Sequence, residues 1–184
     1  QAFGRMTWAK GPKGPWLFLA AGSGITPLMA LIRAHAGKDM PTALTLLYWA
    51  RNRDELCFVD ELRALSQRYP QFKVHFVLTR ESELVDGVRS GRIDSALLTD
   101  LFAVLAQHGV YACGPGGFVD SARALVAPNA RSFTAEAFTP PPRDLEVEAG
   151  GHVEVTLAAS GRTLSVPRGQ SLLTALEGQG LKLA

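Results

Sequence analysis

The stretch that decides the fold is Trp16-Leu17-Phe18-Leu19-Ala20-Ala21-Gly22-Ser23-Gly24-Ile25-Thr26-Pro27, an apolar run followed by a glycine turn and the start of a helix. Its apolar part is typical of a strand covered on both faces of a parallel sheet, and Pro27 suits the first turn of the following helix. Gly22 and Gly24 let a ligand approach the backbone, and the free N–H groups of a helix start favour negative charge. The stretch therefore predicts a phosphate site, with a pyrophosphate as the simplest ligand.

A merely tight strand-to-helix turn is the alternative interpretation of the same residues. The dinucleotide-binding pattern Gly-x-Gly-x-x-Gly is only half present, because its third position is Pro27 and no acidic residue closes the second predicted strand. The Gly-Lys-Ser/Thr ending of an NTP-hydrolysing P-loop is also missing from this stretch. Residues elsewhere in the chain have to decide between the two interpretations.

Composition restricts the class of protein. The chain has 184 residues, 47% of them hydrophobic, which suffices for one domain with a sizeable core and a further fragment. No apolar run approaches the roughly 18 residues that span a membrane, and no secretory signal opens the chain, so we expect a cytoplasmic protein. A formal net charge of +2 with interleaved acidic residues gives no basic stripe for nucleic acid. Two cysteines and four scattered histidines form neither a disulfide framework nor a metal-ligand spacing.

Strand and helix patterns alternate along most of the chain. Strands are predicted over residues 16–21, 43–50, 72–79, 110–113 and 130–134. Helices follow the first four strands, with Asp54 and Asp94 as N-caps and with Cys57 as a core residue inside the second helix. This alternation predicts an α/β fold with a doubly wound five-stranded parallel sheet, whose ligands bind at the carboxyl ends of the strands.

The C-terminal part of the chain has a different pattern. Residues 139–152 are rich in proline and predict a stiff, extended linker. Beyond the linker, residues 153–157 and 163–166 predict a hairpin, and residues 171–177 predict a helix that Gly178 ends. Because the chain opens at Gln1 rather than at Met, we expect it to be a piece of a longer polypeptide.

Several short motifs along the chain follow an order that is known from one family. They are Gly22-Ser23-Gly24-Ile25-Thr26-Pro27, Tyr48-Trp49-Ala50-Arg51, Thr79-Arg80, Cys113-Gly114-Pro115-Gly116 and Glu136-Ala137-Phe138. With this spacing, residues 13–138 resemble the pyridine-nucleotide domain of the ferredoxin-NADP reductase family, and residues 1–12 resemble the end of its FAD-binding barrel. Residues 153–184 resemble the first part of a plant-type ferredoxin domain, a partial β-grasp fold. The chain therefore resembles a fused bacterial reductase, truncated at both ends, of the kind that feeds a desaturase or oxygenase.

The resemblance implies a flavin reductase reaction. NADPH would pass a hydride to FAD, and single electrons would then reach a two-iron two-sulphur centre and an oxygenase or desaturase. It implies that FAD and the cluster belong to the full-length protein, and that this chain alone binds NADP, with NAD possible, without catalysing the reaction. The expected partners are the missing FAD domain, the rest of the ferredoxin and the downstream oxygenase or desaturase. The pyrophosphate is assigned to Gly22, Ser23, Gly24 and Thr26, in agreement with what the turn could do unaided.

The catalytic residues follow from the resemblance as well. It places Cys113 beside the nicotinamide ring, at the head of a small-residue turn in which Gly114 and Pro115 admit the flat cofactor. A buried thiol at a strand end is the alternative interpretation. The resemblance brings Glu136 and Phe138 towards the flavin, although an ordinary strand end could have the same residues.

The choice between NADP and NAD depends on cationic residues. Thr79 and Arg80 follow the third strand where the family often holds the 2′-phosphate of NADP, with Arg92 as a second cationic partner. Arg51, after the second strand, stands where an acidic residue would bind the ribose of NAD, and weakly supports a phosphate there too. A charge-assisted hydrogen bond contributes about 1.5–3 kcal/mol, enough to select NADP. A solvated basic loop is the alternative interpretation.

A different class of function stays open at this point. The chain could be a non-catalytic nucleotide-sensing or protein-docking α/β domain with no redox role. A flavodoxin-like binding module is a third hypothesis, since fold alone does not fix function. Nucleotide binding helps to discriminate between these hypotheses, because a failure to bind any nucleotide argues against the NADPH-binding reductase.

Overall fold

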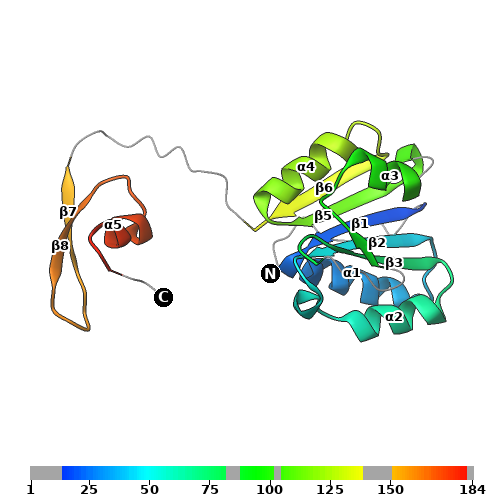
Figure 1. Ribbon diagram of the computed structural model, residues 1–184, viewed down its shortest axis with the longest axis horizontal. Helices are drawn as coiled ribbons and strands as arrows, with labels where there is room; N and C mark the ends of the chain where they lie inside the picture. The colour runs from blue at the N-terminus through cyan, green and yellow to red at the C-terminus, as the bar shows by residue number, and fades with distance from the viewer. Residues whose placement is uncertain (1–13, 82–87, 102–104, 139–150, 182–184) are drawn as a thin grey trace. The chain divides into compact units, whose positions relative to one another are not determined.

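The computed structural model describes residues 14–81, 88–101, 105–138 and 151–181 (Figure 1). The chain divides into two compact units, Gln1–Pro141 and Pro142–Ala184. The predictions for residues 1–12 and for most of the linker at 139–152 fall outside the described residues. Within the described residues, no helix is long and apolar enough to cross a membrane.

The first unit is built on a parallel sheet. Its strands are β1 (Trp16–Ala21), β2 (Leu44–Ala50), β3 (Phe72–Leu78), β4 (Val88–Ser90), β5 (Gly109–Gly114) and β6 (Ser132–Ala137). They pair in the order β4-β3-β2-β1-β5-β6, and each of these pairs is parallel. The α/β class is confirmed, but the sheet has six strands rather than the predicted five. The extra strand is β4, whose three residues are too few to carry a strand periodicity.

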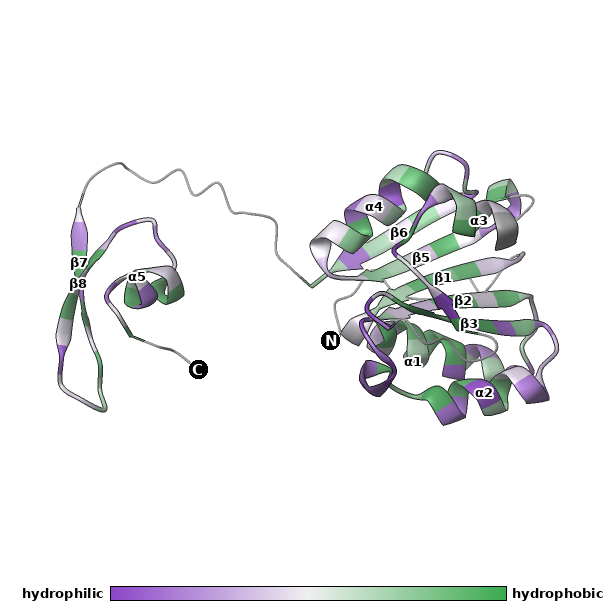
Figure 2. Ribbon diagram, viewed as in Figure 1, coloured by the Kyte–Doolittle hydropathy of each residue, from purple (hydrophilic) through white to green (hydrophobic). Residues whose placement is uncertain are grey.

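Helices cover both faces of this sheet, as the doubly wound prediction requires. They are α1 (Ile25–Ala36), α2 (Val59–Arg68), α3 (Ser95–Leu101) and α4 (Gly116–Val126), with short 3-10 helices η1 (Gly22–Gly24), η2 (Arg53–Glu55) and η3 (Leu105–Gln107). Side chains alternate along β1, so that Phe18 packs with α1 and α2 while Leu17 and Leu19 pack with α3 and α4. In Figure 2, hydrophobic residues run along the central strands, whereas the helices mix hydrophobic and polar residues.

One predicted helix cap is confirmed and the other is wrong. Asp94 caps α3, because its Oδ1 accepts a hydrogen bond from the Leu97 N–H at 2.8 Å. Asp54 lies within η2 instead of capping α2, which starts only at residue 59. Phe58 precedes α2 with a φ of +61°, a left-handed conformation that cannot continue a right-handed helix.

The second unit contains the predicted hairpin and helix. They are β7 (His152–Thr156), β8 (Thr163–Pro167) and α5 (Leu172–Gly178). The two strands pair antiparallel, and the hydroxyl of Ser171 caps α5 by accepting the N–H of Thr174 at 3.1 Å. The buried core of this unit comes from β8 and α5, and consists of Leu164, Val166, Ala175 and Leu176.

Candidate functional site

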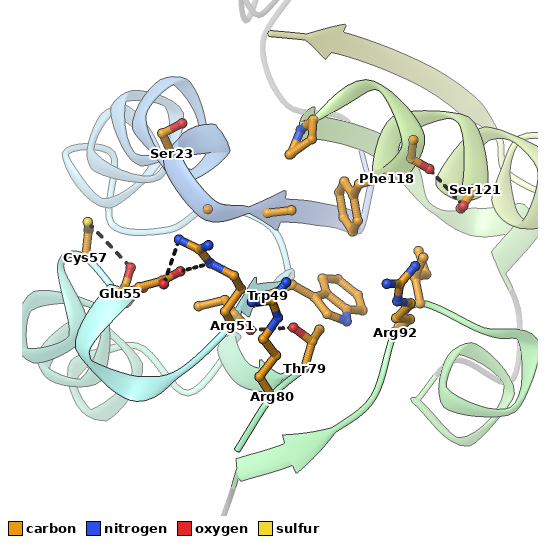
Figure 3. Close-up of a pocket in the computed structure, with 16 residues that line it drawn as sticks. Ser23, Trp49, Arg51, Glu55, Cys57, Thr79, Arg80, Arg92, Phe118 and Ser121 are labelled. Carbon is orange, nitrogen blue, oxygen red and sulfur yellow. Dashed lines mark hydrogen bonds and ion pairs between the residues drawn. The ribbon is translucent and has the colours of Figure 1, made fainter. Parts of the chain in front are cut away.

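A pocket of about 770 Å³ lies at the carboxyl edge of the parallel sheet (Figure 3). Its wall is formed by Ala21, Gly22, Ser23, Trp49, Ala50, Arg51, Glu55, Cys57, Thr79, Arg80, Arg92, Ile93, Pro115, Gly117, Phe118 and Ser121. The strand register brings these segments together, because Ala21 pairs with Trp49 and Ala20 pairs with Cys113. The ends of β1, β2 and β5 therefore lie side by side, at the edge where open α/β sheets bind their ligands.

The glycine turn after β1 forms one wall of this pocket. It continues as η1 directly into α1, and no described side chain caps the start of either helix. Gly22 and Ser23 line the pocket, so the uncapped amide end of the helix faces it. Gly24 is buried beneath the turn, and the Thr26 hydroxyl donates to the Ser23 carbonyl at 2.9 Å. Of the four predicted pyrophosphate residues, two line the pocket and two support the turn.

Three arginines line the pocket, and they differ in their partners. Arg51 forms a two-pronged ion pair with Glu55, at 2.9 Å from Nε and 2.8 Å from the terminal nitrogen. The hydrogen bond from Arg51 and the charge of Arg80 lower the pKa of the Glu55 carboxyl. Arg80 and Arg92 have no carboxylate within ion-pair distance among the described residues. Two guanidinium groups thus remain open to an anion.

Backbone pairing holds Arg80 beside the end of β2. The N–H of Arg80 donates to the Arg51 carbonyl at 2.8 Å, which continues the β2–β3 ladder by one step. The next residue, Glu81, pairs with Arg53 at 3.0 Å and so draws its negative charge away from the pocket wall. Thr79 also lines the pocket, and its hydroxyl lies 3.4 Å from the Ala50 carbonyl.

Two aromatic rings form the wall between the arginines and the glycine turns (Figure 3). Trp49 and Phe118 have ring centroids 5.3 Å apart at an angle of 57°. Our sequence reasoning missed both. Their positions in the sequence could have indicated them. Trp49 lies one residue before the end of a predicted strand, and Phe118 directly follows a glycine turn.

Cys113 does not line the pocket, contrary to the position that its predicted role suggests. Its side chain is fully buried in the core beneath α1, because strand alternation directs Tyr111 and Cys113 to that face of the sheet. Burial, reinforced by the charge of Glu136, raises the pKa of the Cys113 thiol to about 11. A thiol with this pKa is neutral near pH 7 and is therefore no nucleophile. A role beside the nicotinamide stays a prediction.

Of the other residues predicted near this end of the sheet, one lines the pocket and three do not. Pro115 lines the pocket, whereas Gly114 is buried at the end of β5. Glu136 and Phe138 are exposed at and beyond the end of β6, outside the pocket wall. The Phe138 N–H donates to the Gly114 carbonyl at 3.1 Å, which fixes the chain direction there.

Cys57 corrects a second prediction. We expected a core cysteine inside a helix, but Cys57 is exposed and lines the pocket from the segment between η2 and α2. The Tyr48 hydroxyl accepts the Cys57 N–H at 3.1 Å and anchors this segment. Among the described residues, no group of three or more acidic, histidine or cysteine side chains could hold a metal ion.

A doubly wound parallel sheet with a glycine turn and open guanidinium groups at its carboxyl edge is typical of a dinucleotide-binding domain. The family model of the oxidoreductase NAD-binding domain matches residues 18–124, more than half of the chain. The chain belongs to this family. The resemblance to the nucleotide domain of ferredoxin-NADP reductases is thereby confirmed.

The relatives include components of oxygenase systems. One of the component chains of 1,2-phenylacetyl-CoA epoxidase from Escherichia coli K12 is 30% identical over 93% of this chain and 52% of that protein. The ferredoxin reductase component of 3-ketosteroid-9-alpha-monooxygenase from Mycobacterium tuberculosis is 32% identical over 90% of this chain and 48% of that protein. This chain therefore spans about half the length of these curated relatives.

A solved structure shares the fold. The ferredoxin NADP⁺ reductase from Neisseria gonorrhoeae, with bound FAD and NADP, superimposes with a TM-score of 0.62. The match covers 76% of this chain and 62% of that one, at 20% sequence identity. At this identity the likeness establishes the fold alone.

Proposed function

We propose that this chain is the NADPH-binding module of an oxygenase- or desaturase-linked reductase. The observation that carries the proposal is the pair Arg80 and Arg92, which have no ion-pair partner among the described residues and face the same pocket as the glycine turn. The amide end of the helix that starts at this turn suits a pyrophosphate, and the guanidinium groups suit the 2′-phosphate that distinguishes NADP from NAD. A pocket of about 770 Å³ is within the usual range for such ligands.

The donor set fits the nucleotide better than it fits a metal cofactor. Two-iron two-sulphur clusters commonly need four cysteine ligands, and this chain has two, of which one is buried in the core. We therefore assign FAD and the cluster to the remaining half of the full-length reductase, with residues 139–152 as a linker and residues 153–184 as the first part of the ferredoxin domain. When bound there, FAD would accept a hydride and release single electrons.

The contribution of this chain to the reaction is positioning rather than acid–base catalysis. Hydride transfer requires the nicotinamide to be held at close range and in the correct orientation. Anchoring both phosphate groups of the nucleotide at the sheet edge provides that orientation. We propose that Cys113, Glu136 and Phe138 lie at the end of the site where the nicotinamide meets the flavin. Cys113 would contribute there as a neutral, buried thiol that packs beneath the backbone of the site.

The binding half of the proposal is tested with nucleotide fragments that differ only in one phosphate. We expect the purified chain to bind 2′,5′-ADP more tightly than 5′-AMP, which lacks only the 2′-phosphate, in calorimetry. Arg80→Ala should lower the affinity for 2′,5′-ADP by about ten- to 150-fold, because it removes a charge-assisted hydrogen bond of about 1.5–3 kcal/mol. Affinity for 5′-AMP should change little.

Arg162→Ala is the matched control, since it removes the same charge from the second unit. Equal affinities of the unaltered chain for the two fragments would contradict the NADP assignment. The redox half is tested in a longer protein that includes the FAD domain, by NADPH-dependent reduction of an artificial electron acceptor. Nucleotide binding without any such activity would favour a nucleotide-sensing domain.

A further inference from the structure

The indole nitrogen of Trp49 is a buried donor without a partner among the described residues. Trp49 is only 3% exposed, and its Nε1 has less than 1 Å² of accessible surface. No described group accepts a hydrogen bond from it. Because an unpaired donor in the protein interior is costly, the great majority of such groups have partners. This N–H therefore requires an explanation.

The position of Trp49 supplies the explanation. Its ring belongs to the pocket wall and lies between Arg92 on one side and the side chains of Arg51 and Arg80 on the other (Figure 3). The nearby hydroxyl of Thr79 is turned to the Ala50 carbonyl at 3.4 Å. The ring is held in place by its packing on Phe118. A donor that is fixed, desolvated and flanked by cationic groups suits an anionic acceptor.

We infer that the Trp49 Nε1–H donates a hydrogen bond to a phosphate oxygen of the bound nucleotide, at the 2′-phosphate between Arg80 and Arg92. This inference rests on the proposed function and adds a specificity-determining residue to it. The N–H on the packed ring has a fixed direction, whereas the long arginine side chains have to be ordered when the phosphate binds.

Access to the nitrogen requires a small movement of the wall. Since Nε1 has almost no accessible surface, an acceptor can reach it only if a neighbouring side chain shifts. Arg92 is exposed, belongs to the same wall and lies beside the ring in Figure 3. Its guanidinium would turn to meet the phosphate and uncover the indole N–H in the same movement.

The first experiment compares two equal substitutions. Trp49→Phe keeps an aromatic ring against Phe118 but removes the donor at the end of β2. Trp16→Phe makes the same change at the start of β1, outside the pocket wall. We expect Trp49→Phe to lower the affinity for 2′,5′-ADP by about tenfold or more and to leave that for 5′-AMP within about twofold. Trp16→Phe should leave both unchanged. An equal loss for both fragments would overturn the assignment to the 2′-phosphate.

The second experiment uses the unaltered chain, so it does not depend on whether a variant folds. The chain has three tryptophans, so its ¹⁵N-labelled form has three indole N–H resonances, which backbone correlations can assign. Adding 2′,5′-ADP should move the Trp49 resonance downfield and slow its exchange with deuterium, whereas 5′-AMP should not. If 2′,5′-ADP binds and this resonance stays in place, the inference is wrong while the proposed function stands. If neither fragment binds, the proposed function itself fails.

Discussion

Each of the two glycine turns at the carboxyl edge of the sheet contains two glycines that are present for different reasons. In the turn after β1, a Cβ on Gly24 would collide with the backbone carbonyl of Cys113, while a Cβ on Gly22 would meet nothing. In the turn after β5, Gly114 is similarly crowded and Gly117 is open. Each turn thus has one glycine that packing requires and one that faces the pocket.

The crowded glycines belong to a single contact between the turns. A Cβ on Gly114 would lie 2.9 Å from the Ala21 Cβ and 3.0 Å from a ring carbon of Phe118. The end of β1 and the end of β5 therefore approach each other more closely than residues with side chains allow. The comparison shows that a glycine motif at a binding edge contains glycines required for strand packing and glycines that allow a ligand to approach. The sequence of the motif alone does not show which glycine has which role.

Gly24→Ala should have the largest effect of the substitutions that probe this comparison. The added methyl group meets backbone atoms of Cys113 and Gly114, which cannot rotate away as a side chain can. We expect a loss of about 3 kcal/mol or more in the free energy of unfolding, the upper range for overpacking. Denaturation followed by tryptophan fluorescence measures this, because all three tryptophans lie in the first unit. An unfolding midpoint within error of the unaltered chain would show that the turns are not in contact.

The two cysteines provide a second test, because one lies beneath the contact and the other in the pocket wall. At pH 8, iodoacetamide should label Cys57 readily and Cys113 at least about a hundredfold more slowly. Burial and the charge of Glu136 raise the pKa of Cys113 to about 11, so only about 0.1% of it is thiolate at that pH. Labelling of Cys113 should increase as the pH rises towards 11.

Mass spectrometry of peptides after timed labelling gives both rates, and Cys57→Ser should remove the fast reaction. Comparable rates at the two thiols would mean that the end of β5 opens frequently. That result would also restore a direct role for the Cys113 side chain at the nicotinamide.

Much of the fold followed from the sequence because its signals are local. The apolar run before Gly22 and the proline at position 27 fix the end of β1 and the first turn of α1, and Asp94 is a cap in the sequence as in the structure. The hairpin and helix of the second unit were equally visible. The strand β4 was not, because its three residues are defined by pairing with β3 rather than by their own pattern.

The sequence indicated part of the pocket wall, but not the residues whose surroundings depend on packing. Arg80 and Arg92 line the pocket, since polar residues after parallel strands share one edge, while their role in binding a phosphate stays a prediction. Cys57 is exposed because α2 starts only after Phe58, which has a left-handed backbone conformation. No local sequence pattern predicts that conformation. The buried donor of Trp49 depends on which neighbours surround it, and this information exists only in three dimensions.

The smallest expected effects come from the two open glycines, and they should have opposite signs. Gly22 has a φ of +54°, so Gly22→Ala forces a left-handed alanine and should cost about 1 kcal/mol even though its methyl group meets nothing. Gly117 lies in the first turn of α4 with an ordinary φ, so Gly117→Ala should stabilise the unit by about 0.5–1 kcal/mol. The same fluorescence-detected denaturation measures both changes. If the two substitutions shifted stability in the same direction, backbone conformation would not be what separates the open glycines, and ligand approach alone would have to account for them.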